Sequence, residues 1–266
     1  MKDILEEIIA WKRTEIDRQK AQLTPHDIYK QAESRILKEE SLQRPSMSMS
    51  IKSSRSGIIA EFKRKSPSKG WIKENARPDV IPPSYDENGA AALSILTDGK
   101  YFGGSLDDIG IARPLVKAPI LRKDFIIDEY QLFQARIADA DAVLLIAAGL
   151  SKADCKSLAH TAHELQLEVL LETHSEAELE YYEDNLVDMV GVNNRHLGTF
   201  HTDVQTSFDL ASRLPDNVIK VSESGISNPQ TVQKLRKAGF SGFLMGEHFM
   251  KAADPGAALK EFILEL

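Results

Sequence analysis

Ala142-Val143-Leu144-Leu145-Ile146-Ala147 is a short, uninterrupted apolar run rich in branched residues. Similar runs recur on both sides of it, and each is followed by a polar segment with helical spacing. The seven others cover residues 57–63, 91–97, 119–124, 168–173, 189–194, 218–224 and 242–246. Continuous apolar strands without strict alternation are typical of a parallel sheet that is covered on both faces.

Eight strands alternating with helices predict an α/β architecture in which the strands close a (β/α)8 TIM barrel. The chain has 266 residues, 42% of them apolar, and barrels of about 250 residues commonly form one domain. We therefore expect a single domain over residues 1–266, with the barrel at residues 57–266.

Residues 1–50 precede the first strand and predict an N-terminal helical extension. Residues 3–18 and 24–39 have helical character, and the apolar side chains of the first stretch lie close to one face that could cover a barrel end or a loop. Residues 44–55 contain five serines and two methionines, which on composition alone indicates a linker or mobile loop.

Charge and composition narrow the choice of partners and location. The chain has 33 Lys and Arg against 40 Asp and Glu, a net charge of -7, so it offers no broad basic face for nucleic acid. Its longest apolar run, residues 142–148, is far shorter than the roughly 20 residues that a membrane-spanning helix needs. Cys155 has no second cysteine to pair with, and residues 1–10 do not resemble a secretory signal. We expect a cytoplasmic monomer with no membrane or nucleic-acid partner.

Charged residues stand at several predicted strand ends. In this fold the active site lies at the carboxyl ends of the strands. Glu61 and Lys63 end the first strand and, two residues apart, share one face. Lys123 ends the third strand and Glu172 the fifth. Buried charges are costly unless paired, so four inward charges predict catalysis more readily than an ion pair that only stabilises the barrel.

Glycines after the last two strands predict a phosphate site. Ser224-Gly225 follows the seventh strand and Gly246-Glu247 the eighth, and backbone N–H groups there are in the usual phosphate position of the fold. Lys65 or Lys63 could add a cation from the first loop. Each glycine alone would more often be a simple turn.

The histidines and the cysteine do not form a metal motif. No two of His174, His196, His201 and His248 have the i, i+4 spacing with an acid between them, and Cys155 lies in a predicted helix. No G-x-G-x-x-G follows an early strand. We expect neither a metal ion nor a dinucleotide.

The strand ends resemble those of the indole-3-glycerol-phosphate synthase family across the whole barrel. Glu61-Phe62-Lys63-Arg64-Lys65-Ser66-Pro67-Ser68 is similar to the family's signature segment, and five more motifs follow in order, in residues 94–105, 121–127, 171–174, 191–195 and 222–226. The N-terminal extension is also similar to the family's, where it lies over the catalytic face.

Three departures from the family pattern leave the predicted catalytic residues in place. Gly103 stands where many members have a polar residue, which predicts looser substrate contacts. Glu247 replaces a serine of some members and would offer the phosphate only its backbone N–H. Pro78, Pro82 and Pro83 should shorten the first barrel helix to roughly residues 84–88.

The resemblance implies a reaction and roles for the strand-end charges. The substrate would be 1-(2-carboxyphenylamino)-1-deoxyribulose 5-phosphate, which loses carbon dioxide and water as an indole ring closes, in tryptophan biosynthesis. Lys123 resembles the general acid, with a pKa that nearby cations and burial can lower. Glu172 would take a proton or assist departure of the hydroxyl. Lys63 would pair with the substrate carboxylate or act as the acid in dehydration, and Glu61 would orient Lys63 or act as a base.

The resemblance also implies binding residues. Asn193, Arg195 and Glu223 are similar to the polar residues around the sugar, with Glu223 orienting Lys123 or a hydroxyl. Phe102 and Leu197 would be apolar walls for the anthranilate ring, although either could be plain core. The phosphate would be held by Ser66, Ser224, Gly225 and Gly246. No cofactor is implied, because the substrate's own carbonyl is the electron sink, and docking to neighbouring pathway enzymes would be weak.

Two rival functions stay open on the residues alone. Phosphoribosylanthranilate isomerase is a similar barrel, but that family uses a cysteine at the first strand end and an aspartate at the sixth, where this chain has Lys63 and Asn193. A barrel that binds a phosphorylated ligand without turnover would not need the four strand-end charges.

Overall fold

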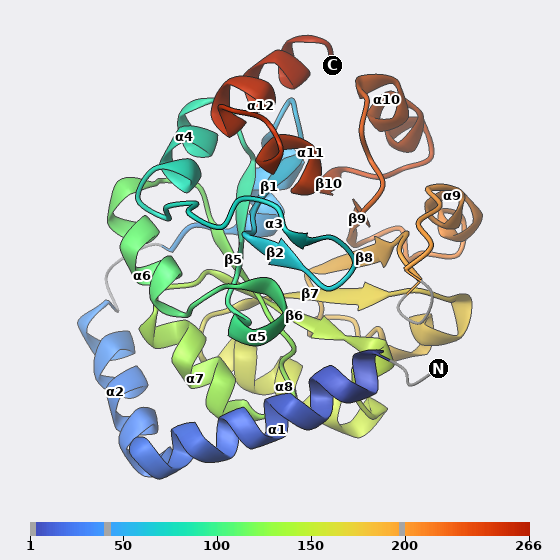
Figure 1. Cartoon of the computed structure of the whole chain (residues 1–266). Coiled ribbons are helices and arrows are strands. Elements are labelled where there is room, and N and C mark those ends of the chain that lie inside the picture. The colour runs from blue at the N-terminus through green and yellow to red at the C-terminus, as the bar shows by residue number, and fades with distance from the viewer. Residues whose placement is uncertain (1–3, 40–43, 197–199) are drawn as a thin grey trace.

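The computed structural model describes residues 4–39, 44–196 and 200–266. Eight parallel strands close a barrel in the order β1-β10-β9-β8-β7-β6-β5-β4 (Figure 1). This confirms the predicted (β/α)8 fold. Each predicted apolar run contains one strand: β1 (Ile58–Phe62), β4 (Ala92–Leu96), β5 (Ile120–Lys123), β6 (Ala142–Ile146), β7 (Glu168–Thr173), β8 (Met189–Asn193), β9 (Ile219–Glu223) and β10 (Gly242–Met245).

Helices surround the barrel and bury the outward apolar side chains of the strands. They are α4 (Ile81–Glu87), α5 (Gly99–Phe102), α6 (Asp107–Ala112), η1 (Arg113–Leu115), α7 (Glu129–Ile137), η2 (Ala147–Gly149), α8 (Lys152–Glu164), η3 (Glu176–Tyr181), α9 (Gln205–Leu210), α10 (Pro229–Lys237), α11 (Glu247–Met250) and α12 (Pro255–Leu264). Among the described residues, no helix combines the length and apolar character needed to cross a membrane.

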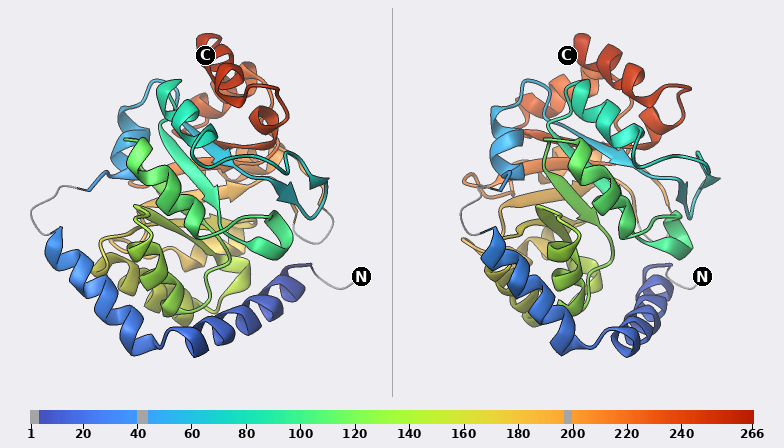
Figure 2. Two further views of the ribbon diagram at one scale, coloured as in Figure 1. Left: turned by 60° about the vertical axis from the view of Figure 1, so that its left-hand side comes forward. Right: turned by 90° about the vertical axis from the view of Figure 1, so that its left-hand side faces the viewer.

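The N-terminal extension forms two helices, as predicted: α1 (Ile4–Gln22) and α2 (Pro25–Lys38). Thr24 begins α2 by accepting a hydrogen bond from the Asp27 amide. Helix α2 packs along α7, and α1 contacts both α7 and η2. Both views in Figure 2 place the start of α1 at the same end of the barrel as a small hairpin, β2 (Lys65–Ser66) and β3 (Gly70–Trp71). The extension therefore reaches the end where the loops after the strands gather.

The prediction of a loop over residues 44–55 is wrong, because α3 (Met47–Ser53) lies there. Met47 and Ile51, four residues apart, are buried against the inward side chains at the amino-terminal end of the barrel. The Glu168 carboxylate accepts hydrogen bonds from the Met47 and Ser48 amides at 2.6 and 2.9 Å. The many serines suggested a loop, but the Glu168 carboxylate and the burial of Met47 and Ile51 stabilise a helix.

The predicted start of the first barrel helix is also wrong. Helix α4 begins at Ile81, and Pro82 lies within its first turn. Proline is tolerated there because the amides of the first turn have no partner within the helix. Pro82 and Pro83 therefore belong to α4 and do not interrupt it, and Pro78 precedes the helix.

Candidate active site

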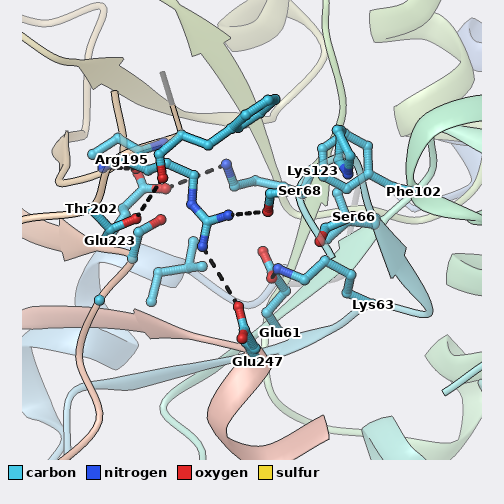
Figure 3. Close-up of a pocket in the computed structure, with 18 of the residues that line it drawn as sticks. Glu61, Lys63, Ser66, Ser68, Phe102, Lys123, Arg195, Thr202, Glu223 and Glu247 are labelled. Atoms are coloured by element: carbon cyan, nitrogen blue, oxygen red, sulfur yellow. Dashed lines mark hydrogen bonds and ion pairs between the residues drawn. The ribbon is translucent and has the colours of Figure 1, made fainter. Parts of the chain in front are cut away.

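A cavity of about 760 Å³ opens at the carboxyl ends of the barrel strands. Most of the residues that the sequence singled out line it. They are Glu61, Lys63, Ser66, Phe102, Lys123, Glu172, Asn193, Arg195, Glu223, Ser224, Gly225, Gly246 and Glu247 (Figure 3 shows most of their side chains).

Two predicted residues are not placed at the cavity. Lys65 is the neighbour of Ser66 in β2, and successive side chains of a strand point to opposite faces. Its ammonium group donates to the Lys100 carbonyl at 3.1 Å and lies 5.4 Å from the centre of the Trp71 ring. Leu197 falls outside the described residues.

Two lysines and three glutamates make up the charged floor of the cavity. Lys123 Nζ lies 2.8 Å from Glu172 Oε2 and 3.3 Å from Glu223 Oε2. Lys63 Nζ lies 2.5 Å from Glu61 Oε1. All five side chains come from strand ends and are mostly buried. The predicted convergence of four charges from three strand ends is present, and Glu223 of β9 adds a fifth charge from a fourth strand.

The electrostatic surroundings of Lys123 differ from the prediction. Burial by itself lowers the pKa of Lys123, but Glu172, Glu223 and Glu61 together outweigh burial and raise that pKa above its ordinary value. The sequence predicted nearby cations, whereas the charged groups closest to Lys123 are the carboxylates of Glu172, Glu223 and Glu61. Lys123 therefore stays an ammonium group over the whole neutral range.

Glu172 is held as a carboxylate. Burial would raise the pKa of Glu172, but Lys123 and His174 lower it below the ordinary value. Asn193 Nδ2 donates to Glu172 Oε1 at 3.1 Å, which fixes the orientation of the carboxylate. A proton acceptor and a proton donor thus lie in contact at the floor of the cavity.

Glu223 has the opposite shift. Burial, with help from Glu172 and Glu61, raises the pKa of Glu223 to about 7 in spite of Lys123. Within the described part of the chain, its Oε1 atom makes no hydrogen bond. The ionised form of Glu223 is therefore disfavoured in the folded protein.

A Glu223→Gln variant should consequently be more stable than the wild type in alkaline solution. A carboxyl whose pKa is raised on folding destabilises the fold increasingly as pH rises from the unfolded value, near 4.5, through about 7. The variant's gain in thermal unfolding midpoint should be full at pH 8.5 and absent at pH 4. An equal gain at both pH values, or a loss at pH 8.5, would contradict this assignment.

Two glycines make room for the buried carboxylates. A Cβ atom at Gly191 would lie 2.2 Å from Glu223 Oε1, and one at Gly246 would lie 2.4 Å from Glu61 Oε1. Real Cβ atoms do not approach so closely, so any side chain at either position would displace a glutamate.

Gly191→Ala should therefore reduce turnover by about 10- to 100-fold, because displacements of about 1 Å at an active site cost that much. The displaced Glu223 would move relative to Lys123. Gly110→Ala is the matched control, since a Cβ atom there meets nothing within 4 Å. Turnover and thermal unfolding of both variants test this expectation. Unchanged turnover in Gly191→Ala would show that the position of Glu223 is unimportant.

Arg195 reaches across the mouth of the cavity. Its Nη1 atom donates to Ser68 Oγ at 2.7 Å, and its Nη2 atom lies 3.6 Å from Glu247 Oε2 (Figure 3). Asn193 Oδ1 accepts from the Arg195 amide at 3.0 Å. Lys251, which sequence reasoning missed, also lines the cavity and pairs with Glu247 at 2.6 Å. Lys251 follows the last residue of the short helix α11 and stands four residues after Glu247. This spacing could have indicated from the sequence that it lies near Glu247.

One side of the cavity is apolar. Phe102 and Phe125 have ring centres 6.0 Å apart, and Leu5 and Ile8 of α1 line the same cavity. Sequence reasoning placed Phe102 here but missed Phe125 and assigned no role to individual residues of α1. Phe125 stands two residues after Lys123, the last residue of β5. Its position just beyond a strand end could have identified it as a residue of the cavity.

The structure gives a reason for a glycine at position 103 that differs from the predicted loosening of substrate contacts. It ends α5 in the left-handed region, with φ of 66°, and a Cβ atom there would lie 2.7 Å from the Trp71 ring. Gly103 therefore lets the β2–β3 hairpin pack closely against α5.

Comparisons with known proteins agree with this geometry. A family model described as indole-3-glycerol phosphate synthase matches residues 5–262. The indole-3-glycerol phosphate synthase of Bacteroides thetaiotaomicron is 59% identical over 263 residues, which is 99% of this chain and 98% of the relative. That of Polaromonas naphthalenivorans is 42% identical over the full length of both chains.

Solved structures show the fold alone. The 3-hexulose-6-phosphate synthase from Salmonella typhimurium has a TM-score of 0.61 at 16% identity, covering 79% of this chain and 97% of that chain. The orotidine 5'-phosphate decarboxylase from Pyrococcus horikoshii has a TM-score of 0.58 at 12% identity, covering 78% and 98%. Because the family model and the relatives cover almost the whole length of the chain, the chain belongs to the indole-3-glycerol phosphate synthase family.

Proposed function

We propose that this protein is a decarboxylating lyase that converts 1-(2-carboxyphenylamino)-1-deoxyribulose 5-phosphate to indole-3-glycerol phosphate. The observation that carries the proposal is the pair of lysine–glutamate contacts, Lys123–Glu172 and Lys63–Glu61, at the floor of one cavity. The reaction needs two proton donations to oxygen and one proton removal from carbon. These two pairs supply donors and acceptors for all three.

The cavity can accommodate the two ends of this substrate separately. The aromatic ring fits the apolar side, between Phe102, Phe125 and the α1 residue Ile8. The phosphate fits the opposite side, where Ser224, Gly225 and Gly246 follow β9 and β10 and the cations of Arg195 and Lys251 are close by. Seated in this way, the ketone lies over the charged floor.

Ring closure is the step for Lys123. The ring carbon that bears the carboxylate attacks the ketone carbon, and the ketone oxygen takes a proton from the Lys123 ammonium group. The raised pKa of Lys123 ensures that the proton is present at neutral pH. The attack leaves the ring nitrogen as an iminium, which accepts the electron pair when the bond to carbon dioxide breaks. Aromaticity is then restored.

Dehydration follows and restores the starting protonation states of Lys123 and Glu172. The new hydroxyl leaves as water with a proton from Lys63, and Glu172 removes the proton from the adjacent carbon to complete the indole. Glu172 then returns this proton to Lys123, which lies 2.8 Å away. Lys63 regains its proton from solvent, so each turnover consumes one proton, as the conversion of a carboxylate to carbon dioxide requires.

The direct test is to incubate the purified protein with this substrate, without added metal or cofactor, and to follow indole absorbance and carbon dioxide release. We expect both products in equal amounts. Binding of the substrate without turnover would instead favour a ligand-binding barrel. The predictions of a cytoplasmic location, a monomeric state and weak docking to neighbouring enzymes stay predictions.

A further inference from the structure

Lys12 of α1 is a buried cation that the proposed reaction does not use. Its side chain is 3% exposed. Its Nζ atom lies 2.9 Å from Asp98 Oδ2, 2.9 Å from Asp124 Oδ1 and 2.6 Å from Glu15 Oε2. Asp98 follows β4 and Asp124 follows β5, so this lysine joins the N-terminal extension to the ends of two neighbouring barrel strands.

Each of the two aspartates fixes the backbone just before an aromatic wall of the cavity. Asp98 Oδ1 accepts hydrogen bonds from the Tyr101 amide at 2.7 Å and the Phe102 amide at 3.3 Å, and thereby caps α5. Asp124 Oδ1 accepts from the Phe125 amide at 2.8 Å. Both carboxylates are fully or almost fully buried, so they need a cation in contact with them.

We propose that Lys12 is a positioning residue that sets the spacing of Phe102 and Phe125, and hence the affinity for the aromatic end of the substrate. The proposal rests on the proposed function for the identity of that substrate. The Lys12 ammonium group pairs with both aspartates. Each aspartate in turn accepts a hydrogen bond from the backbone amide of one of the two phenylalanines.

The two aspartates do not depend on Lys12 equally. Asp124 Oδ2 is also held by Thr97 at 2.6 Å and by Arg122 at 3.0 Å. For Asp98, Lys12 is the cation in contact among the described residues. Without Lys12, the turn that carries Phe102 should shift, while Lys123 beside Asp124 should stay in place. Loss of a wall that contacts substrate and transition state alike raises KM and leaves kcat nearly unchanged.

The test compares Lys12→Met with Lys20→Met. Lys20 is a matched control because it lies in the same helix and pairs with an aspartate after β5, Asp128, at 2.6 Å but away from the cavity. We expect Lys12→Met to raise KM at least tenfold with kcat within threefold, and to weaken binding of the substrate whose ketone is reduced to an alcohol by a similar factor. Lys20→Met should change neither constant by more than twofold.

A second variant and a second measurement keep the proposal testable if Lys12→Met does not fold. Lys12→Met combined with Asp98→Asn removes one buried charge of each sign and keeps an oxygen for the α5 cap, but it still breaks the bridge, so KM should again rise. Amide hydrogen exchange without ligand should be faster at Tyr101 and Phe102 in the Lys12 variants alone. Wild-type values of KM and exchange in a folded Lys12 variant would overturn the proposal. Failure of the proposed function would instead appear as absent turnover in the wild type.

Discussion

Replacing Lys123 with methionine is expected to lower kcat by about 10²- to 10⁴-fold, the usual contribution of a general acid. The ammonium group of Lys123 is the donor in contact with Glu172 and Glu223, and methionine has a similar length without a proton to give. The apolar wall and the phosphate side are untouched, so binding of the reduced substrate should change much less than kcat. Steady-state kinetics and calorimetric binding measure the two effects separately.

The residual activity of this variant should have its own pH dependence. In the wild type, Lys123 keeps the pKa of Glu172 low against the effect of burial. Without that cation, burial dominates and raises the pKa of Glu172, so residual turnover should increase with pH as Glu172 loses its proton.

Lys220→Met is the matched control for Lys123→Met. Lys220 is also a mostly buried strand lysine, but its ammonium group faces the Ala211 carbonyl, outside the cavity. Equal losses of kcat in both variants would show that the effect comes from damage to the barrel and not from a lost acid.

The sequence was sufficient to predict the barrel and its charged floor because both depend on local patterns. Each strand is an apolar run, and the active site of this fold lies where those runs end. Glu61, Lys63, Lys123 and Glu172 were found as the charged residues at these ends. Lys65 does not line the cavity, because the chain leaves β1 before it and turns into the β2–β3 hairpin.

Features that depend on contacts between distant segments could not be predicted in this way. Nothing in the sequence around Lys12 distinguishes it from an ordinary solvent-facing lysine of a helix. Only the docking of α1 places it between Asp98 and Asp124. Helix α3 depends on the Glu168 carboxylate, more than 100 residues further along the chain. The pKa of Lys123 reflects three glutamates from three other strands, and no local pattern reveals the sum of their charges.

Glu172→Gln is expected to separate the two products of the reaction. Glutamine keeps an oxygen for the Asn193 amide, which donates to Glu172 Oε1 at 3.1 Å, but it cannot remove a proton from carbon. Ring closure and decarboxylation precede that step in the proposed sequence. Formation of indole should therefore fall by about 10²- to 10⁴-fold, and in a single turnover carbon dioxide should appear before indole while the hydroxylated intermediate accumulates.

Glu168→Gln is the control for this variant, because Glu168 lies at the opposite end of the same strand and holds α3. Glu168→Gln should lower the thermal unfolding midpoint and leave kcat nearly unchanged, so a large loss of kcat should be confined to Glu172→Gln. Carbon dioxide and indole falling in step in Glu172→Gln would place the role of Glu172 before decarboxylation. The pair Lys123–Glu172 would then act as one unit in ring closure, and the proton at the adjacent carbon would have to leave through Glu61 or Glu223, the two other carboxylates in contact with a lysine at the floor of the cavity.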